Sequence, residues 1–265
     1  MSAKKNIIEI DNSNCVLPSN VRLLDFLTHG PNFELNELII KKIYKYLQDT
    51  GLTNFYNNDK ILDILTKFTN YDLEKLKKDY CMSNYSDVIE QLMFPPLYDI
   101  VFLIEDGSNM TLEYKNLCGM YIINIMLATE LYDGNGVYIR TLNTDNQLDN
   151  SILGGDICKF IDKLETKNVS ESLGEMMYDK VFECVIKPTV DDLDKPVFLI
   201  VLMNDIPINK DEVLESLERC KVESQHKMFI SFVNITKSSQ VENYHKELIS
   251  NNNVKLTSSL HKIFT

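Results

Sequence analysis

Acidic and polar residues directly follow two apolar runs of the sequence, and their oxygen atoms could bind a cation. Residues 100–104 form the first run, and the sequence EDGSN follows it. Residues 196–203 form the second run, and Asn204-Asp205 follows it. Hard divalent cations such as Mg²⁺ prefer oxygen ligands of this kind. Two alternatives follow: the protein has no cofactor, or it binds a Mg²⁺ ion weakly, with the candidate ligands Glu105, Asp106, Ser108 and Asp205.

Motifs typical of catalytic and nucleotide-binding sites are absent from the sequence. It contains no G-x-S-x-G nucleophile motif and neither of the phosphate-binding patterns G-x-x-x-x-G-K-[ST] and G-x-G-x-x-G. The four histidines are scattered, and none has a partner at a spacing typical of a metal or catalytic site. We therefore expect no catalytic residues, no bound organic cofactor and no enzymatic activity.

The two apolar runs predict the central strands of a parallel β-sheet. Both runs are continuously apolar, which is typical of strands that helices cover on both faces. In open α/β sheets, ligands bind in the loops at the carboxyl ends of the strands. The polar residues that follow the two runs should therefore meet at one edge of the sheet.

Strand patterns alternate with helix patterns after residue 96. The strands are expected at residues 98–105, 137–142, 196–203 and 228–233, and the helices at 117–131, 157–164, 173–186, 211–221 and 240–249. Such alternation indicates right-handed crossover connections. The expected fold class is α/β, with a Rossmann-like, doubly wound, mostly parallel sheet and helices on both of its faces.

A small helical region should precede this sheet. Residues 1–20 are polar and are expected to be flexible. Apolar residues at helical spacing follow, and Gly51 is a helix stop signal. Pro95-Pro96 then ends the helical pattern, because proline does not continue a helix. The predicted organisation is a flexible N-terminus at 1–20, a helical region at 21–96 and an α/β domain at 97–265.

Composition excludes several classes of partner and location. The 265 residues carry a formal net charge of −12, which disfavours binding to nucleic acid or to an anionic membrane. The six cysteines are far apart and form no C-x-x-C pair, which argues against a disulfide framework. No run approaches the roughly 20 apolar residues of a membrane span, and the N-terminus has no signal-peptide pattern. We expect an intracellular, cytoplasmic protein, with the nucleus as the alternative location.

The sequence from Tyr98 onward resembles a von Willebrand factor A domain, most closely the intracellular kind found in fungi and protists. The resemblance extends over roughly residues 97–250 and is carried by YDIVFLIEDGSNM, YDGNGVYIRTLN, VSESLGEMMYDKVF and DKPVFLIVLMNDIP. It implies a Rossmann-like fold, a metal-ion-dependent adhesion site and a role in binding proteins.

The adhesion-site motif of that family is degenerate in this sequence. The family has Asp-x-Ser-x-Ser after the first strand, a threonine from a middle loop and an aspartate after the fourth strand. A gapless match places Glu105, Gly107 and Asn109 on the first motif, whereas a shift by one residue places Asp106, Ser108 and Met110 there. The threonine position falls near Glu171, between Ser170 and Ser172, and the last aspartate falls at Asn204 or Asp205.

The resemblance predicts a non-catalytic adaptor or scaffold that binds another protein. Its contact surface would be the loops at 105–111, 170–172 and 204–209, with Asn109, Ser170, Ser172 and Asn204 as contact residues. One alternative is a metal-dependent hydrolase or phosphoryl-transfer enzyme that uses Asp106 and Asp205, since one fold serves many functions. Another is a structural subunit of a larger assembly. Asp106 and Ser108 could also simply cap the next helix or order a turn.

Overall fold

The chain divides into two compact units, Met1–Asn70 and Tyr71–Thr265. The structure, a computed structural model, describes residues 33–69, 97–107, 110–130, 136–144, 146–151, 154–164, 195–203, 205–206, 210–223, 228–235 and 238–251. The expected flexible N-terminus, the expected boundary at Pro95-Pro96 and the expected helix at 173–186 lie outside these residues. They stay predictions.

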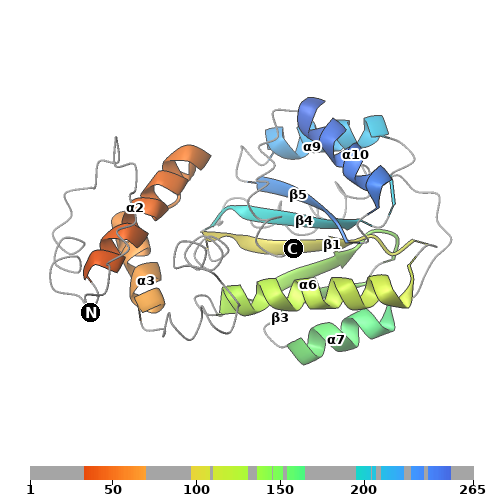
Figure 1. Ribbon diagram of the computed structural model, residues 1–265, viewed down its shortest axis with the longest axis horizontal. Helices are drawn as coiled ribbons and strands as arrows, with labels where there is room; N and C mark the ends of the chain where they lie inside the picture. Colours follow the sequence, from red (N-terminus) through yellow and green to blue (C-terminus); the bar gives the residue numbers. More distant parts are fainter. Residues whose placement is uncertain are drawn as a thin grey trace, which may run out of the picture. The chain divides into compact units, whose positions relative to one another are not determined.

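The first unit is helical, as predicted. It contains α2 (Phe33–Thr50), a short 3₁₀ helix η1 (Leu52–Asn54) and α3 (Asn58–Thr69) (Figure 1). Its core is formed by apolar side chains of these helices and of Tyr56, namely Ile39, Ile40, Ile43, Leu47, Leu52, Tyr56, Ile61 and Ile64. Gly51 follows α2 with a φ of 73°, a left-handed conformation that glycine adopts without steric cost. The predicted helix stop is therefore confirmed.

The second unit is built on a five-stranded sheet. Its strands are β1 (Asp99–Ile104), β2 (Val137–Thr141), β3 (Gln147–Ser151), β4 (Val197–Met203) and β5 (Met228–Asn234). The strand order is β3-β2-β1-β4-β5. All neighbouring pairs are parallel except β2 and β3, which are antiparallel. The mostly parallel sheet that the sequence predicts is confirmed, with β1 and β4 side by side near its centre.

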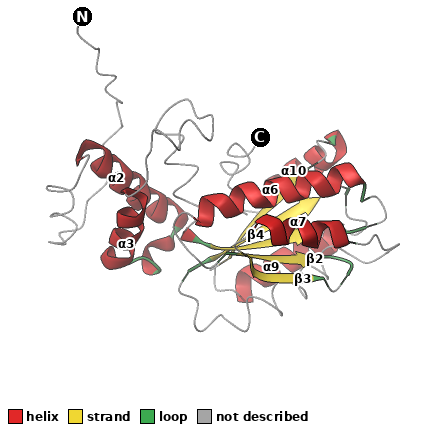
Figure 2. Cartoon of the chain, turned by 90° about the horizontal axis from the view of Figure 1, so that it is seen from below, coloured by secondary structure: helices red, strands yellow, loops and turns green. Residues whose placement is uncertain are grey.

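Helices cover both faces of this sheet. Figures 1 and 2 show α6 (Leu112–Glu130) and α7 (Gly154–Lys163) on one face, and α9 (Lys210–Glu223) and α10 (Ser239–Asn251) on the other. Successive side chains of β1 point alternately to the two faces of the sheet. Leu103 belongs to a core cluster with Val213 of α9 and Tyr244 of α10, whereas the ring of Phe102 lies edge-on to Tyr121 of α6.

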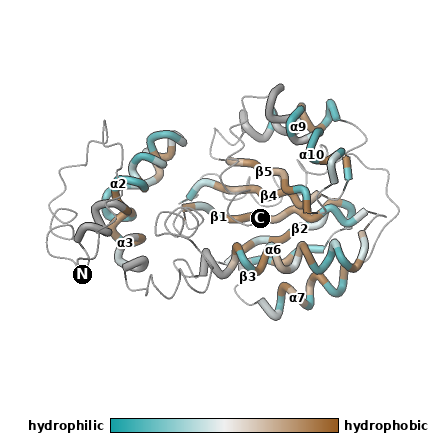
Figure 3. Tube along the Cα trace, in the orientation of Figure 1, coloured by the Kyte–Doolittle hydropathy of each residue, from teal (hydrophilic) through white to brown (hydrophobic). Residues whose placement is uncertain are grey.

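The central strands are apolar except for Asp99 at the start of β1, because both of their faces are buried. All seven residues of β4 and five of the six residues of β1 are buried, and Figure 3 colours both strands as hydrophobic. Strand β3 has the polar sequence QLDNS and was not among the predicted strands. It lies at the end of the strand order, where a strand tolerates polar residues. None of the described helices is long and apolar enough to cross a membrane.

Candidate functional site

The polar residues that follow β1 and β4 lie at the same edge of the sheet. Ile104 at the end of β1 is in register with Leu202 of β4. The backbone amide of Glu105 extends this pairing and donates a hydrogen bond to the carbonyl oxygen of Leu202 at 3.1 Å. We call the ends of β1 and β4, together with the described parts of their following loops, the carboxyl edge. The predicted meeting of the two segments is observed.

Glu105 and Asp205 are in direct contact at the carboxyl edge. The Oε2 atom of Glu105 accepts a hydrogen bond from the backbone amide of Asp205 at 3.1 Å. Asp205 is exposed, and its Oδ1 atom accepts a hydrogen bond from the amide of Ile206 at 2.8 Å. One carboxylate from each central loop is therefore presented at this edge.

Asp106 is fully buried and is directed toward the turn that follows β2. Its Oδ1 atom accepts a hydrogen bond from the amide of Asn143 at 2.6 Å, and its Oδ2 atom accepts one from the Thr144 hydroxyl at 2.5 Å. A buried carboxylate requires partners of this kind, because leaving it without them is costly. Asp106 thus ties the loop after β1 to the loop after β2.

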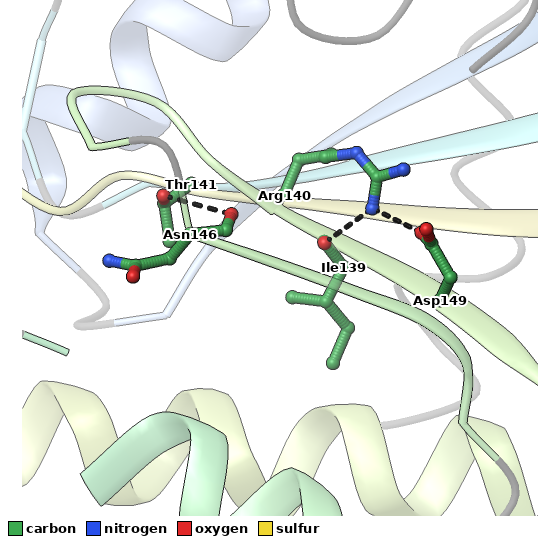
Figure 4. A network of polar contacts seen from close by, with 5 residues as sticks. All are labelled: Ile139, Arg140, Thr141, Asn146 and Asp149. Carbon is green, nitrogen blue, oxygen red and sulfur yellow. Dashed lines mark hydrogen bonds and ion pairs between the residues drawn. The ribbon is translucent and has the colours of Figure 1, made fainter. Parts of the chain in front are cut away.

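The turn that Asp106 holds has further internal hydrogen bonds. The hydroxyl of Thr144 lies 2.7 Å from the hydroxyl of Thr141. It also accepts a hydrogen bond from the side-chain amide of Asn146 at 2.6 Å. The hydroxyl of Thr141 also donates a hydrogen bond to the backbone carbonyl oxygen of Asn146 at 3.2 Å, as Figure 4 shows. Of the two simple roles considered for Asp106, the structure shows the ordering of a turn. The described cap of α6 is Thr111, whose Oγ1 atom accepts a hydrogen bond from the amide of Tyr114 at 3.1 Å.

Two protonated side chains of α6 lie beneath the carboxyl edge. The hydroxyl of Tyr114 donates a hydrogen bond to the carbonyl oxygen of Leu202 at 2.7 Å, and the side chain is fully buried. Burial is the largest cause that raises the pKa of Tyr114 well above its ordinary value, and interactions with Cys118, Glu105 and Asp106 raise it further. Burial also raises the pKa of Cys118 to about 12. Neither side chain is ionised near neutral pH, so neither is an activated nucleophile.

Sequence reasoning did not identify Tyr114. The signal that could have identified it is a tyrosine in the first turn of a helix that follows a central strand. A buried tyrosine hydroxyl requires a hydrogen-bond partner, and the carbonyl groups at the ends of neighbouring strands are within its reach.

The described residues do not complete a metal site. Both carboxylate oxygens of Asp106 accept hydrogen bonds inside the protein, and Glu105 and Asp205 each use one oxygen on a backbone amide. No group of three or more histidine, cysteine, aspartate or glutamate side chains suited to a metal occurs among the residues with described positions. The other candidate residues, Ser108, Asn109, Ser170, Ser172 and Asn204, lie outside the described part of the chain. The Mg²⁺ site stays a prediction.

An exposed apolar side chain lies next to the carboxyl edge. Leu112 is the first residue of α6 and is 73% exposed. Met120, two turns further along the same helix, is 63% exposed. Tyr114, Cys118 and Ile122 cover the opposite side of α6 and are buried. Helix α6 therefore has apolar residues both toward the core and toward solvent.

No protein-family model matches the sequence, and a search of curated proteins finds no match either. The resemblance to the von Willebrand factor A domain therefore stays an expectation from the residues quoted above.

Proposed function

We propose that this chain is a non-catalytic, intracellular adaptor or scaffold whose von Willebrand factor A-like domain binds another protein at its carboxyl edge. The observation that carries the proposal is the contact between Glu105 and Asp205, at the ends of two adjacent central strands. This edge is where open α/β sheets bind their ligands.

The chemistry of the edge favours a particular kind of partner. Glu105 and exposed Asp205 present negative charge, and Leu112 offers an apolar side chain at the start of the adjacent helix. Interfaces commonly place a few anchoring side chains at their centre and polar groups around them. Complementary charge raises the association rate and orients the partner. A partner segment with basic side chains around an apolar one would fit.

The buried groups near the edge support a binding role over catalysis. Asp106 uses both carboxylate oxygens to hold a turn. The hydroxyl of Tyr114 donates a hydrogen bond to a backbone carbonyl, and Cys118 is kept as a thiol by burial. Each of these three ionisable groups serves the structure of the edge.

Affinity capture from cells of the source organism, followed by binding measurements with the purified partner, tests the proposal. Asp205→Arg and Leu112→Glu should each weaken the complex at least about tenfold, because the first reverses a charge and the second removes an apolar anchor. The matched control is Glu242→Arg on α10, which reverses an exposed charge outside the two loops. Wild-type affinity in both edge variants, with folding verified by circular dichroism, would refute the proposed binding surface.

A further inference from the structure

Arg140 is a buried cation near the end of β2. It is 6% exposed and is in register with Leu103, which belongs to the core cluster beneath α9 and α10. Figure 4 shows its side chain on the side of β2 opposite to Ile139. A charged side chain this deeply buried is rare unless its hydrogen-bonding groups have partners.

Both polar contacts of Arg140 use the same terminal nitrogen. The Nη1 atom donates to the carbonyl oxygen of Ile139 at 2.9 Å and forms an ion pair with Oδ1 of Asp149 on β3 at 2.5 Å. The Nε atom is buried and has no hydrogen-bond partner. In Figure 4, Nε and the second terminal nitrogen, Nη2, lie away from the two contacts. The contacts of the guanidinium group are therefore on Nη1, and the buried Nε is unsatisfied.

The unsatisfied side has the geometry that recognises anions. A guanidinium group carries its N–H donors in a fixed planar arrangement, and two neighbouring donors bind the two oxygens of a carboxylate or phosphate together. Asp149 occupies only Nη1 and is 47% exposed at its side chain. It therefore neutralises part of the charge, while Nε stays without a hydrogen-bond partner.

A second donor lies on the same face of β2. Tyr138 is two residues before Arg140, so both side chains point to one side of the strand, and Tyr138 packs against the core cluster. Burial, with the nearby charges of Asp99 and Asp149, raises the pKa of Tyr138 and outweighs the opposite effect of Arg140. The phenol is therefore neutral at physiological pH and keeps its proton for a hydrogen bond.

We propose that the Nε–Nη2 side of Arg140 binds the carboxylate or phosphate group of a small anionic ligand. The unpartnered buried Nε is the observation that carries this site. Arg140 presents little surface, because it is only 6% exposed, so the ligand that we propose is a single anionic group. This site is independent of the protein partner proposed for the carboxyl edge.

Nuclear magnetic resonance of the full chain tests the proposal directly. The sequence has three arginines, Arg22, Arg140 and Arg219, so the ¹H–¹⁵N spectrum has three arginine Nε–H signals, and Arg140→Lys assigns the one of interest. Sodium acetate and sodium phosphate are titrated separately, at constant ionic strength set with sodium chloride. We expect a saturable shift of the Arg140 signal and no saturable shift for Arg219, which is exposed on α9.

The two anions distinguish the chemical source of the ligand. Saturation with acetate alone indicates a carboxylate ligand, and saturation with phosphate alone indicates a phosphate ligand. Line broadening of ¹³C-labelled acetate and of the ³¹P signal of phosphate detects binding from the ligand side. Arg140→Lys should reduce that binding about tenfold, because lysine keeps the charge and loses the paired donors. No saturation and no broadening with either anion would overturn the proposal.

Asp149→Asn provides a variant with the opposite expected effect. It removes a negative charge beside the site and should strengthen anion binding severalfold, whereas Asp156→Asn on α7 serves as the charge-matched control. Unchanged or weaker anion binding in Asp149→Asn would contradict the proposed position of the ligand.

Discussion

The carboxylate of Glu105 accepts a hydrogen bond from the backbone amide of Asp205, a residue 100 positions further along the chain. The parallel pairing of β1 with β4 brings the two residues together. The next residue, Asp106, makes equivalent contacts to the turn after β2. Two consecutive acids therefore connect the loops of three neighbouring strands.

Replacing Glu105 should loosen the contact between the loops of β1 and β4. Glu105→Ala should lower the free energy of unfolding by about 0.5–1.5 kcal/mol, the usual net contribution of one hydrogen bond. Glu105→Gln should lower it less, because the amide oxygen still accepts a hydrogen bond from Asp205. Urea unfolding of the full chain measures both values. An equal loss in the two variants would argue against this hydrogen bond as the cause.

Replacing Asp106 should have a larger effect on stability. Asp106→Ala leaves the amide of Asn143 and the hydroxyl of Thr144 without their buried acceptor, and should cost about 2–4 kcal/mol. Asp106→Asn should cost less, since its amide can accept from Asn143 and donate to the rotatable hydroxyl of Thr144. Asp205→Ala, which changes an exposed acid, is the control and should cost under about 1 kcal/mol. Urea unfolding gives the comparison, and equal losses in Asp106→Ala and Asp205→Ala would be incompatible with the burial of Asp106.

Cys118 should make the protein less stable in alkaline solution. Its pKa is about 12 in the folded protein and has an ordinary value of 9.0. Between these values the unfolded chain releases the thiol proton while the folded chain keeps it, so the free energy of unfolding falls as pH rises. The contribution reaches at most about 1.4 kcal/mol per pH unit.

Urea unfolding of wild type and Cys118→Ala, on both sides of pH 9.0, tests this dependence. The variant should be less stable at neutral pH, because a buried side chain is shortened. Its stability should nevertheless decrease less steeply above pH 9.0 than that of wild type. Parallel curves for the two proteins would assign the alkaline dependence to other groups.

Position 51 should require glycine because of its backbone conformation and not because of a lack of space for a side chain. Its φ is +73°, and a Cβ atom added there would meet nothing within 4 Å. Gly51→Ala should therefore destabilise the helical unit by about 1 kcal/mol through backbone strain. Gly51→Asn should cost less, because asparagine tolerates the left-handed region. Thermal unfolding followed by circular dichroism at 222 nm, a helix-sensitive wavelength, checks the order of the three proteins. Equal stability of wild type and Gly51→Ala would contradict the conformation described.

Calorimetry with Mg²⁺ and Mn²⁺ tests the predicted cation site. A weak site should give saturable heat at millimolar ion, and Asp205→Ala should reduce it because that change removes an exposed carboxylate from the edge. Glu242→Ala on α10 is the control for loss of an exposed acid. No heat with either ion would remove the metal from the proposed function and would leave the protein-binding proposal to its own test.

The sequence predicted the central part of the fold because burial on both faces leaves a continuous apolar pattern. Strands β1 and β4 and helices α7, α9 and α10 lie within a few residues of their expected positions. The edge strand β3 was missed because its exposed residues are polar and carry no such pattern. The start of α6 at Leu112 lies five residues before the expected one, since its first turn is capped by Thr111 and is not apolar throughout.

The sequence by itself determined that two apolar strands would end in acidic loops and that those loops would share one edge of a sheet. Only the tertiary structure decided how the acids differ. Glu105 contacts the loop of β4 at the edge, whereas Asp106 is buried against Asn143 and Thr144. Neighbouring acids have nearly the same intrinsic chemistry, so their roles depend on partners distant in the sequence. Those partners come together only when the parallel strands pair.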